Sequence, residues 1–215
     1  MDQKDLFIFG DVPLQSVELI ELEDGELLWV RHFYDEDTAR QLYSRLQEEI
    51  PWQQDSLHIA GKDIPIPRLQ AWFGDPGMTY TYSGLTLEPH PWTETLLHIK
   101  KQIENYGDHR FNSLLANLYR NEHDSVGWHA DDEPELGANP IIASVSLGSE
   151  RTFQLKHRQH ADRKLSLELG SGDLLIMKGT LQHFWQHQIP KSRQPCEPRI
   201  NLTFRRIIGP DAGKL

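Results

Sequence analysis

The amino-acid sequence predicts an α+β fold in which a jelly roll (double-stranded β-helix) follows N-terminal helices and hairpins. Short apolar or alternating runs follow one another after residue 110, as is typical of an all-β sandwich or barrel. Two helical patterns and a stretch rich in Gly, Pro, Thr and Tyr come before them. At 215 residues the chain fits one domain. We therefore expect a single domain over residues 1–215, with an N-terminal extension at 1–110 and a jelly-roll core at 111–208.

The N-terminal elements have local signals. The first thirty residues indicate short strands and turns. Asp35 begins a helix, because acidic residues suit the positive end of the helix dipole, and Pro51 ends it. A second helix begins at Thr93. Between the helices, residues 55–90 predict hairpins and exposed loops.

Seven strands are predicted in the C-terminal part, separated by glycines or charged turns. They are Phe111–Tyr119, Pro140–Leu147, Thr152–Lys156, Leu165–Leu169, Leu174–Met177, His183–Ile189 and Arg199–Ile207.

Composition excludes some classes of protein. The single cysteine, Cys196, excludes an internal disulfide and a Cys-rich zinc site. No apolar run is long enough for a membrane helix and the N-terminus has no basic leader, so we expect no signal peptide and a cytoplasmic protein (nuclear if eukaryotic). The net charge of −10 lies wholly in the first sixty residues, which carry 14 acidic and 4 basic side chains. The rest is neutral, with 18 of each, so a nucleic-acid partner is not excluded.

Two His-x-Asp triplets occur, His129-Ala130-Asp131 and His160-Ala161-Asp162. Residues two apart on a strand face the same side, so His129 and Asp131 can bind one metal ion. A hydrogen-bonded surface pair is the alternative. The second triplet lies in a polar turn between two predicted strands, and we interpret it as solvated surface.

The segment from Arg199 to Arg205 alternates polar and apolar residues at period two. Its apolar side predicts a core face, and its polar side (Arg199, Asn201, Thr203 and Arg205) predicts an interior cleft for an anionic ligand. The two arginines lie six residues apart, about 20 Å along a strand, so they approach a ligand from its two ends. A solvated edge strand is the alternative.

His187 is the candidate third metal ligand, with His183 as its competitor. If the strand that carries His187 folds back onto residues 199–205, His187 and Arg199 become neighbours. Two histidines and one aspartate form the facial triad of non-haem Fe(II) oxygenases.

Together these segments resemble the AlkB-type 2-oxoglutarate- and Fe(II)-dependent dioxygenases. The core of that family is similar to NLYRNEHDSVGWHADDEPELG, PIIASVSLGSERTFQLKH, HFWQHQIP and RINLTFR, and its DNA-repair subgroup to PRLQAWFGDPGMTYTYSGLTLEPHPW. The resemblance covers about residues 55–207. It implies that His129, Asp131 and His187 hold Fe(II), with 2-oxoglutarate and O2 as co-substrates.

The resemblance also implies roles for other residues. The expected 2-oxoglutarate ligands are Asn117, Tyr119, Arg199, Asn201, Thr203 and Arg205. The expected substrate contacts are Tyr80, Thr81, Tyr82, Asp132 and Glu133, of which the tyrosines would stack on a damaged base. Lys62 and Arg68, which flank the proposed pocket loops, are further expected substrate contacts because of their charge. Some relatives carry a bulky apolar finger before Gly-Lys. Here the position holds Ala60, which is too small to fill the gap, so we expect single strands to be preferred over duplex DNA. The alternative is that Ile59 supplies the wedge.

The implied function is oxidative demethylation of N-alkylated bases in DNA, with release of formaldehyde, succinate and CO2, by a protein that acts as a monomer. One alternative is a dioxygenase for methylated RNA or protein. Another is a catalytically silent jelly-roll module that binds a small acid. For the nucleic-acid footprint the sequence offers five basic residues between positions 151 and 164, namely Arg151, Lys156, Arg158, Arg163 and Lys164.

Overall fold

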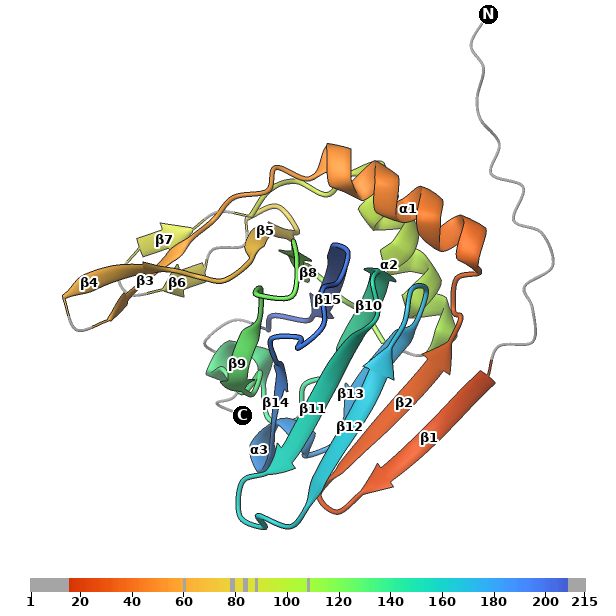
Figure 1. Cartoon of the computed structure of the whole chain (residues 1–215), viewed down its shortest axis with the longest axis vertical. Coiled ribbons are helices and arrows are strands. Elements are labelled where there is room, and N and C mark those ends of the chain that lie inside the picture. The colour runs from red at the N-terminus through yellow and green to blue at the C-terminus, as the bar shows by residue number, and fades with distance from the viewer. Residues whose placement is uncertain are drawn as a thin grey trace, which may run out of the picture.

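The computed structural model describes residues 16–208, apart from residues 60, 78–79, 83–84, 88 and 108. Two antiparallel sheets pack face to face, and two helices cover the outer face of the larger sheet (Figure 1). This three-layer arrangement confirms the predicted jelly roll with N-terminal helices.

The major sheet has seven strands in the order β1-β2-β13-β10-β15-β8-β5. They are β1 (Ser16–Leu22), β2 (Gly25–Arg31), β5 (Leu69–Gly74), β8 (Ser113–Tyr119), β10 (Ile142–Gly148), β13 (Leu174–Lys178) and β15 (Arg199–Arg205). The minor sheet has the order β12-β11-β14-β9. Its strands are β9 (Val126–His129), β11 (Arg151–His157), β12 (Lys164–Leu169) and β14 (Trp185–Ile189).

Helices α1 (Glu36–Glu49) and α2 (Glu94–Tyr106) begin where the sequence predicts. The Asp35 carboxylate accepts a hydrogen bond from the Thr38 backbone N–H at 2.7 Å, and the Thr93 hydroxyl caps α2 in the same way. Their apolar faces pack against the major sheet. Two short helical turns, η1 (Pro134–Leu136) and α3 (Leu181–Phe184), lie between core strands. None of the described helices is long and apolar enough to cross a membrane.

Two hairpins project from the side of the sandwich (Figure 1). They are β3 (Ser56–Ile59) with β4 (Lys62–Pro65), and β6 (Tyr80–Tyr82) with β7 (Leu85–Leu87). The predicted finger residue Ala60 lies outside the described residues, as do the side chains of Ile59, Tyr80, Thr81 and Tyr82. The roles predicted for them stay predictions.

Strand β15 confirms the period-two pattern. Ile200, Leu202 and Phe204 are fully buried in the layer between the major sheet and the helices. The polar residues of the same strand face the space between the two sheets. One face of β15 therefore packs in the core beneath the helices, and its other face lines a cavity.

Three features differ from the sequence interpretation. Strands β2 and β5, which precede residue 110, extend the major sheet, so the N-terminal part contributes to the core sheet itself. The predicted strand at 183–189 begins as α3 and becomes extended only at Trp185. The conditional pairing of this strand with β15 is wrong, because β14 pairs with β11 and β9 in the minor sheet. The chain between β14 and β15 crosses from one sheet to the other.

Candidate metal centre and co-substrate cavity

A cavity opens between the two sheets at one end of the sandwich. The major sheet contributes polar side chains from β8, β10 and β15, and the minor sheet contributes the histidines. The lining residues are Arg68, Leu115, Asn117, Tyr119, Val126, His129, Asp131, Ser144, Phe153, Met177, His187, Ile189, Arg199, Asn201, Thr203 and Arg205.

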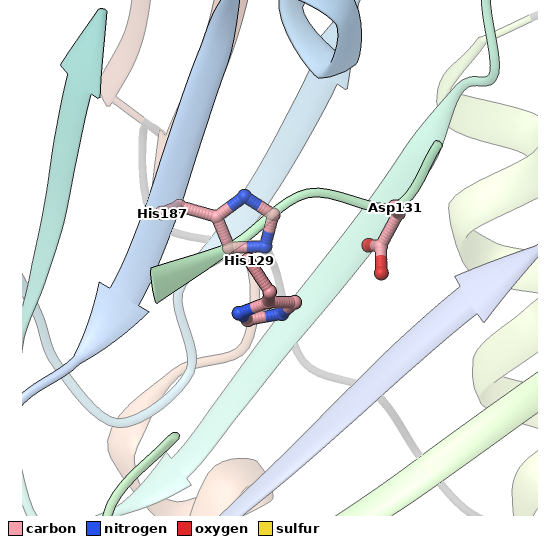
Figure 2. Close-up of side chains that lie close together, drawn as sticks. All are labelled: His129, Asp131 and His187. Carbon is pink, nitrogen blue, oxygen red and sulfur yellow. The ribbon is translucent and has the colours of Figure 1, made fainter. Parts of the chain in front are cut away.

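His129, Asp131 and His187 meet in this cavity. One ligand atom from each lies within 4.8 Å of the other two, and the two imidazole rings have centroids 4.3 Å apart. Figure 2 shows the three side chains pointing toward one another. His187 reaches His129 because β14 and β9 pair with these two residues directly opposite each other. Asp131 lies two residues further, beyond the end of β9.

The neighbours of these three residues leave atoms free for a metal ion. The Nδ1 atom of His129 lies 2.8 Å from the Gly127 carbonyl oxygen, which can only accept, so Nδ1 carries the proton and Nε2 keeps its lone pair. Asp131 Oδ2 and His187 Nδ1 are buried and have no hydrogen-bond partner among the described residues. Unpartnered buried polar atoms are costly, and a cation between them removes that cost. The site fits Fe(II), which binds two histidines and one carboxylate.

The charges of the centre suit a cation. Burial by itself raises the pKa of the Asp131 carboxyl, but Arg205 and the two histidines outweigh burial and lower this pKa to about 2. Burial lowers the pKa of His187 to about 3, so this imidazole is neutral. A neutral imidazole and an ionised carboxylate are the forms that bind metals.

Asp131 is held by two partners far away in the sequence. Arg205 donates to Asp131 Oδ1 at 2.8 Å, which leaves the other carboxylate oxygen for the metal. The backbone N–H of Asp131 donates to the side-chain oxygen of Gln182 at 3.0 Å. Gln182 lies on α3 and is 1% exposed. The sequence interpretation missed Gln182, because a glutamine in a short helical turn carries no signal for this role.

The predicted 2-oxoglutarate ligands lie together on β8 and β15. These strands pair in a register that places Arg199 opposite Tyr119 and Asn201 opposite Asn117. All six predicted residues line the cavity (Asn117, Tyr119, Arg199, Asn201, Thr203 and Arg205). Their function as ligands stays a prediction.

Arg199 is the group best suited to a free carboxylate. It is 1% exposed, and its Nη2 donates to the Ser146 hydroxyl at 2.9 Å. Its Nε and Nη1 are buried and have no hydrogen-bond partner in the part of the chain that the structure describes. Burial lowers the pKa of this guanidinium to about 10, so it remains charged at neutral pH. A buried guanidinium with two free nitrogens can bind a carboxylate through two parallel hydrogen bonds.

Two serines that the sequence interpretation left out support the ligand face. Ser144 accepts from Asn201 Nδ2 at 2.7 Å, and Ser146 accepts from Arg199. Both lie on β10, next to β15 in the sheet. Their alternation with Ala143, Val145 and Leu147 is a period-two signal that could have identified them.

The other candidate histidines lie elsewhere. His183 is exposed and contacts the Ala138 carbonyl, so it is not part of the cluster. His160 and Asp162 lie in an exposed turn, as the sequence predicts. Among the described residues, the only group with the spacing of a metal site is the cluster in the cavity.

The predicted substrate contacts that the structure describes lie in different places, and only Arg68 lines the cavity. Arg68 lines the cavity and donates to Asn117 Oδ1 at 2.7 Å, and Lys62 is exposed on β4. Asp132 is exposed and forms an ion pair with Arg158 at 2.7 Å. Glu133 is half-buried, and burial raises the pKa of its carboxyl.

The predicted basic footprint at residues 151–164 needs correction. Arg151 is 3% exposed and cannot reach a phosphate. Arg158 is paired with Asp132, and Arg163 with Glu23. Lys156 and Lys164 form no ion pair among the described residues, and Lys156 lies 4.4 Å from the centroid of the Trp128 ring.

Comparison with known proteins agrees with this geometry. A family model described as the 2OG-Fe(II) oxygenase superfamily matches residues 26–205. The chain is 45% identical over 184 residues to the alpha-ketoglutarate-dependent dioxygenase alkB homolog 3 of Bos taurus, covering 81% of this chain and 64% of that protein. It is 37% identical over 180 residues to the DNA oxidative demethylase ALKBH2 of Homo sapiens, covering 79% of this chain and 69% of that protein.

A solved structure of OsALKBH1 has the same fold, with a TM-score of 0.65 at 19% identity, covering 88% of this chain and all of that one. The chain spans 64% of the length of the Bos taurus relative. These matches confirm the resemblance to the AlkB-type proteins and give the family cofactors, Fe(II) and 2-oxoglutarate, to a cavity whose residues fit both. By sequence, fold and cavity, the chain belongs to the 2OG-Fe(II) oxygenase superfamily.

Proposed function

We propose that the chain is an oxidative demethylase that acts on N-alkylated bases in DNA and releases formaldehyde, succinate and CO2. The observation that carries this proposal is one cavity with two sets of unpartnered buried atoms. Asp131 and His187 offer such atoms to a cation, and Arg199 offers them to an anion. The names of the relatives, which include DNA oxidative demethylases, support DNA as the substrate.

When bound, Fe(II) with 2-oxoglutarate and O2 supplies the oxidising power for hydroxylation of an N-methyl group. The chain's own residues bind and orient. His129, Asp131 and His187 would hold the metal, with Arg205 fixing the Asp131 carboxylate. Arg199 would pair with the carboxylate at the far end of 2-oxoglutarate. The apolar walls Leu115, Phe153, Met177 and Ile189 would limit the access of water.

The damaged base would be recognised by residues outside the metal and co-substrate sites. Alkylation of a ring nitrogen gives the base a positive charge, which favours stacking on an aromatic ring and a nearby carboxylate. Tyr80 and Tyr82 on β6 would supply the rings. Asp132 or Glu133, next to the metal ligand Asp131, would supply the carboxylate.

We propose a preference for single strands. Duplex repair requires a side chain to fill the gap left by a flipped base, and Ala60, which precedes Gly61-Lys62 in the sequence, is too small for that. Lys62, Lys156 and Lys164 would contact the phosphates. We further propose that the chain acts as a monomer in a reducing compartment, the cytoplasm or a nucleus, which fits its single cysteine.

Mass spectrometry of matched oligonucleotides tests the function. Single-stranded DNA, duplex DNA and RNA with one N-methylated base are incubated with the protein, Fe(II), 2-oxoglutarate and O2. We expect loss of one methyl group, fastest from single-stranded DNA, with one formaldehyde and one succinate per event. Asp131→Ala is the inactive control.

The outcomes separate the alternatives. Demethylation of RNA alone assigns the substrate to RNA. Succinate release with no demethylated oligonucleotide points to another substrate class, such as protein. Binding of 2-oxoglutarate without succinate under any condition identifies a silent module and overturns the proposal.

A further inference from the structure

Arg151 is a buried cation that neither the metal set nor the co-substrate set includes. It begins β11 and is 3% exposed. Among the described residues it forms no ion pair, and its hydrogen bonds go to main-chain carbonyl groups. Burial raises the pKa of the nearby Asp124 carboxyl, and Arg120 and Arg151 lower it, but Asp124 forms its ion pair with Arg120. A buried guanidinium that forms no ion pair of its own is costly to bury, so its position needs a physical reason.

The hydrogen bonds of Arg151 join the two strands that carry the metal histidines. Its Nη2 donates to the carbonyl oxygen of Asp124 at 2.9 Å and to that of Pro190 at 2.7 Å. Asp124 lies two residues before β9, which carries His129. Pro190 directly follows β14, which carries His187. One planar guanidinium therefore fixes the start of one strand against the end of the other.

The same guanidinium lies behind the anion end of the cavity. Its Cζ atom is 5.6 Å from the centroid of the Tyr119 ring, and the Cζ atom of Arg199 is 5.4 Å from the same centroid. Tyr119 is thus contacted by two cations. Burial is the main cause of the lowered pKa of Arg199, and the positive charge of Arg151 lowers this pKa further. The two guanidinium groups therefore lie close enough to interact electrostatically.

The cavity has a metal end and an anion end. Arg205 contacts the metal ligand Asp131, whereas Arg199 lies at the other end of β15. A 2-oxo acid that chelates the metal through its first carboxylate and keto group would place a second carboxylate toward Arg199 and Tyr119. Arg151 does not line the cavity, so it would act through these two residues.

We propose that Arg151 is a positioning residue for the co-substrate: it holds Tyr119 in place and adds positive charge behind the site of the distal carboxylate. This inference rests on the proposed binding of 2-oxoglutarate and assigns a role to a residue outside the cavity lining. It predicts that Arg151 selects for a dicarboxylate over a monocarboxylate.

The test compares two ligands that differ only in the distal carboxylate, 2-oxoglutarate and 2-oxopentanoate. Each is titrated anaerobically into protein with Fe(II), and the visible charge-transfer band reports binding. We expect Arg151→Met to bind 2-oxoglutarate about tenfold more weakly, which corresponds to about 1.4 kcal/mol, and to bind 2-oxopentanoate like the unaltered protein. Arg151→Lys keeps the charge and loses the fork, so its loss is smaller and again confined to the dicarboxylate.

Arg163→Met is the matched control, because Arg163 pairs with Glu23 away from the cavity; it leaves both affinities unchanged. Equal weakening of both ligands in Arg151→Met, or unaltered 2-oxoglutarate affinity, overturns the proposal. If Arg151→Met does not fold, Arg151→Gln is judged by the same criterion. The readout needs no nucleic acid, so a protein that binds 2-oxoglutarate selectively but demethylates no oligonucleotide refutes only the proposed function.

Discussion

The triplets His129-Ala130-Asp131 and His160-Ala161-Asp162 have the same residues and opposite surroundings. The first begins on β9, where His129 lies opposite His187 of β14. Its aspartate, Asp131, is 4% exposed and forms hydrogen bonds with Arg205 and with the Gln182 side chain. The second lies in an exposed turn, where the backbone N–H of His160 donates to His157 Nδ1 at 3.1 Å. The metal-binding capacity of the first triplet therefore comes from a third ligand and from buried partners, not from the motif.

The largest difference between the triplets should appear when their aspartates are removed. Asp131→Ala deletes a metal ligand and leaves Arg205 unpaired, so we expect Fe(II)-dependent turnover of 2-oxoglutarate to be abolished. Asp162→Ala should leave turnover unchanged. Succinate release and metal content after dialysis measure both. Full turnover by purified Asp131→Ala would remove the basis for the metal assignment.

The first triplet shares its cavity with Arg199 and Arg205, whereas the second triplet lies in an exposed turn. Variants of the two arginines therefore test a feature that belongs to the first triplet. Arg199→Ala should weaken 2-oxoglutarate binding about 10- to 150-fold, the range for loss of a charge-assisted contact. Arg205→Ala should weaken it as well, and it also frees the Asp131 carboxylate. Titration calorimetry with Mn(II) in place of Fe(II) measures the affinity, with Arg163→Ala as the control. Unaltered affinity in both cavity variants would contradict the assignment of this strand face.

Gln182 tests whether the partners of the first triplet matter. Gln182→Met keeps the shape but removes the acceptor for the Asp131 backbone N–H. We expect about tenfold weaker metal binding, at the lower end of the range for residues that orient metal ligands. Gln188→Met is the matched control, because Gln188 pairs with Gln154 in the minor sheet and does not line the cavity. If both variants bind the metal with equal affinity, the Gln182 contact does not position Asp131.

The smallest effect concerns the region of the second triplet, which has lysines on either side. Lys156→Glu with Lys164→Glu should weaken binding of single-stranded DNA and make the log–log salt dependence shallower by about 1.4, or about 0.7 per lost phosphate contact. Fluorescence anisotropy at several salt concentrations measures this slope, and Arg163→Glu is the control. An unchanged slope would show that this region takes no part in nucleic-acid binding. Lys62 and the cavity rim would then remain as the contact surface.

The sequence by itself determined the features that depend on neighbouring residues. The caps Asp35 and Thr93 fix the starts of both helices, because a cap bonds to a backbone group three residues away. The period of two in residues 199–205 fixes which side chains share a face, because a strand turns every second residue to the same side.

Only the tertiary structure decided which strands meet. The sequence interpretation considered a pairing of the His187 strand with residues 199–205, but β14 pairs with β9, so His187 lies opposite His129 instead of Arg199. The contact of Gln182 with Asp131 spans 51 positions, and those of Arg151 span 27 to 39. No local pattern encodes such contacts, because they depend on how the two sheets pack, and packing is settled by the whole set of buried residues at once.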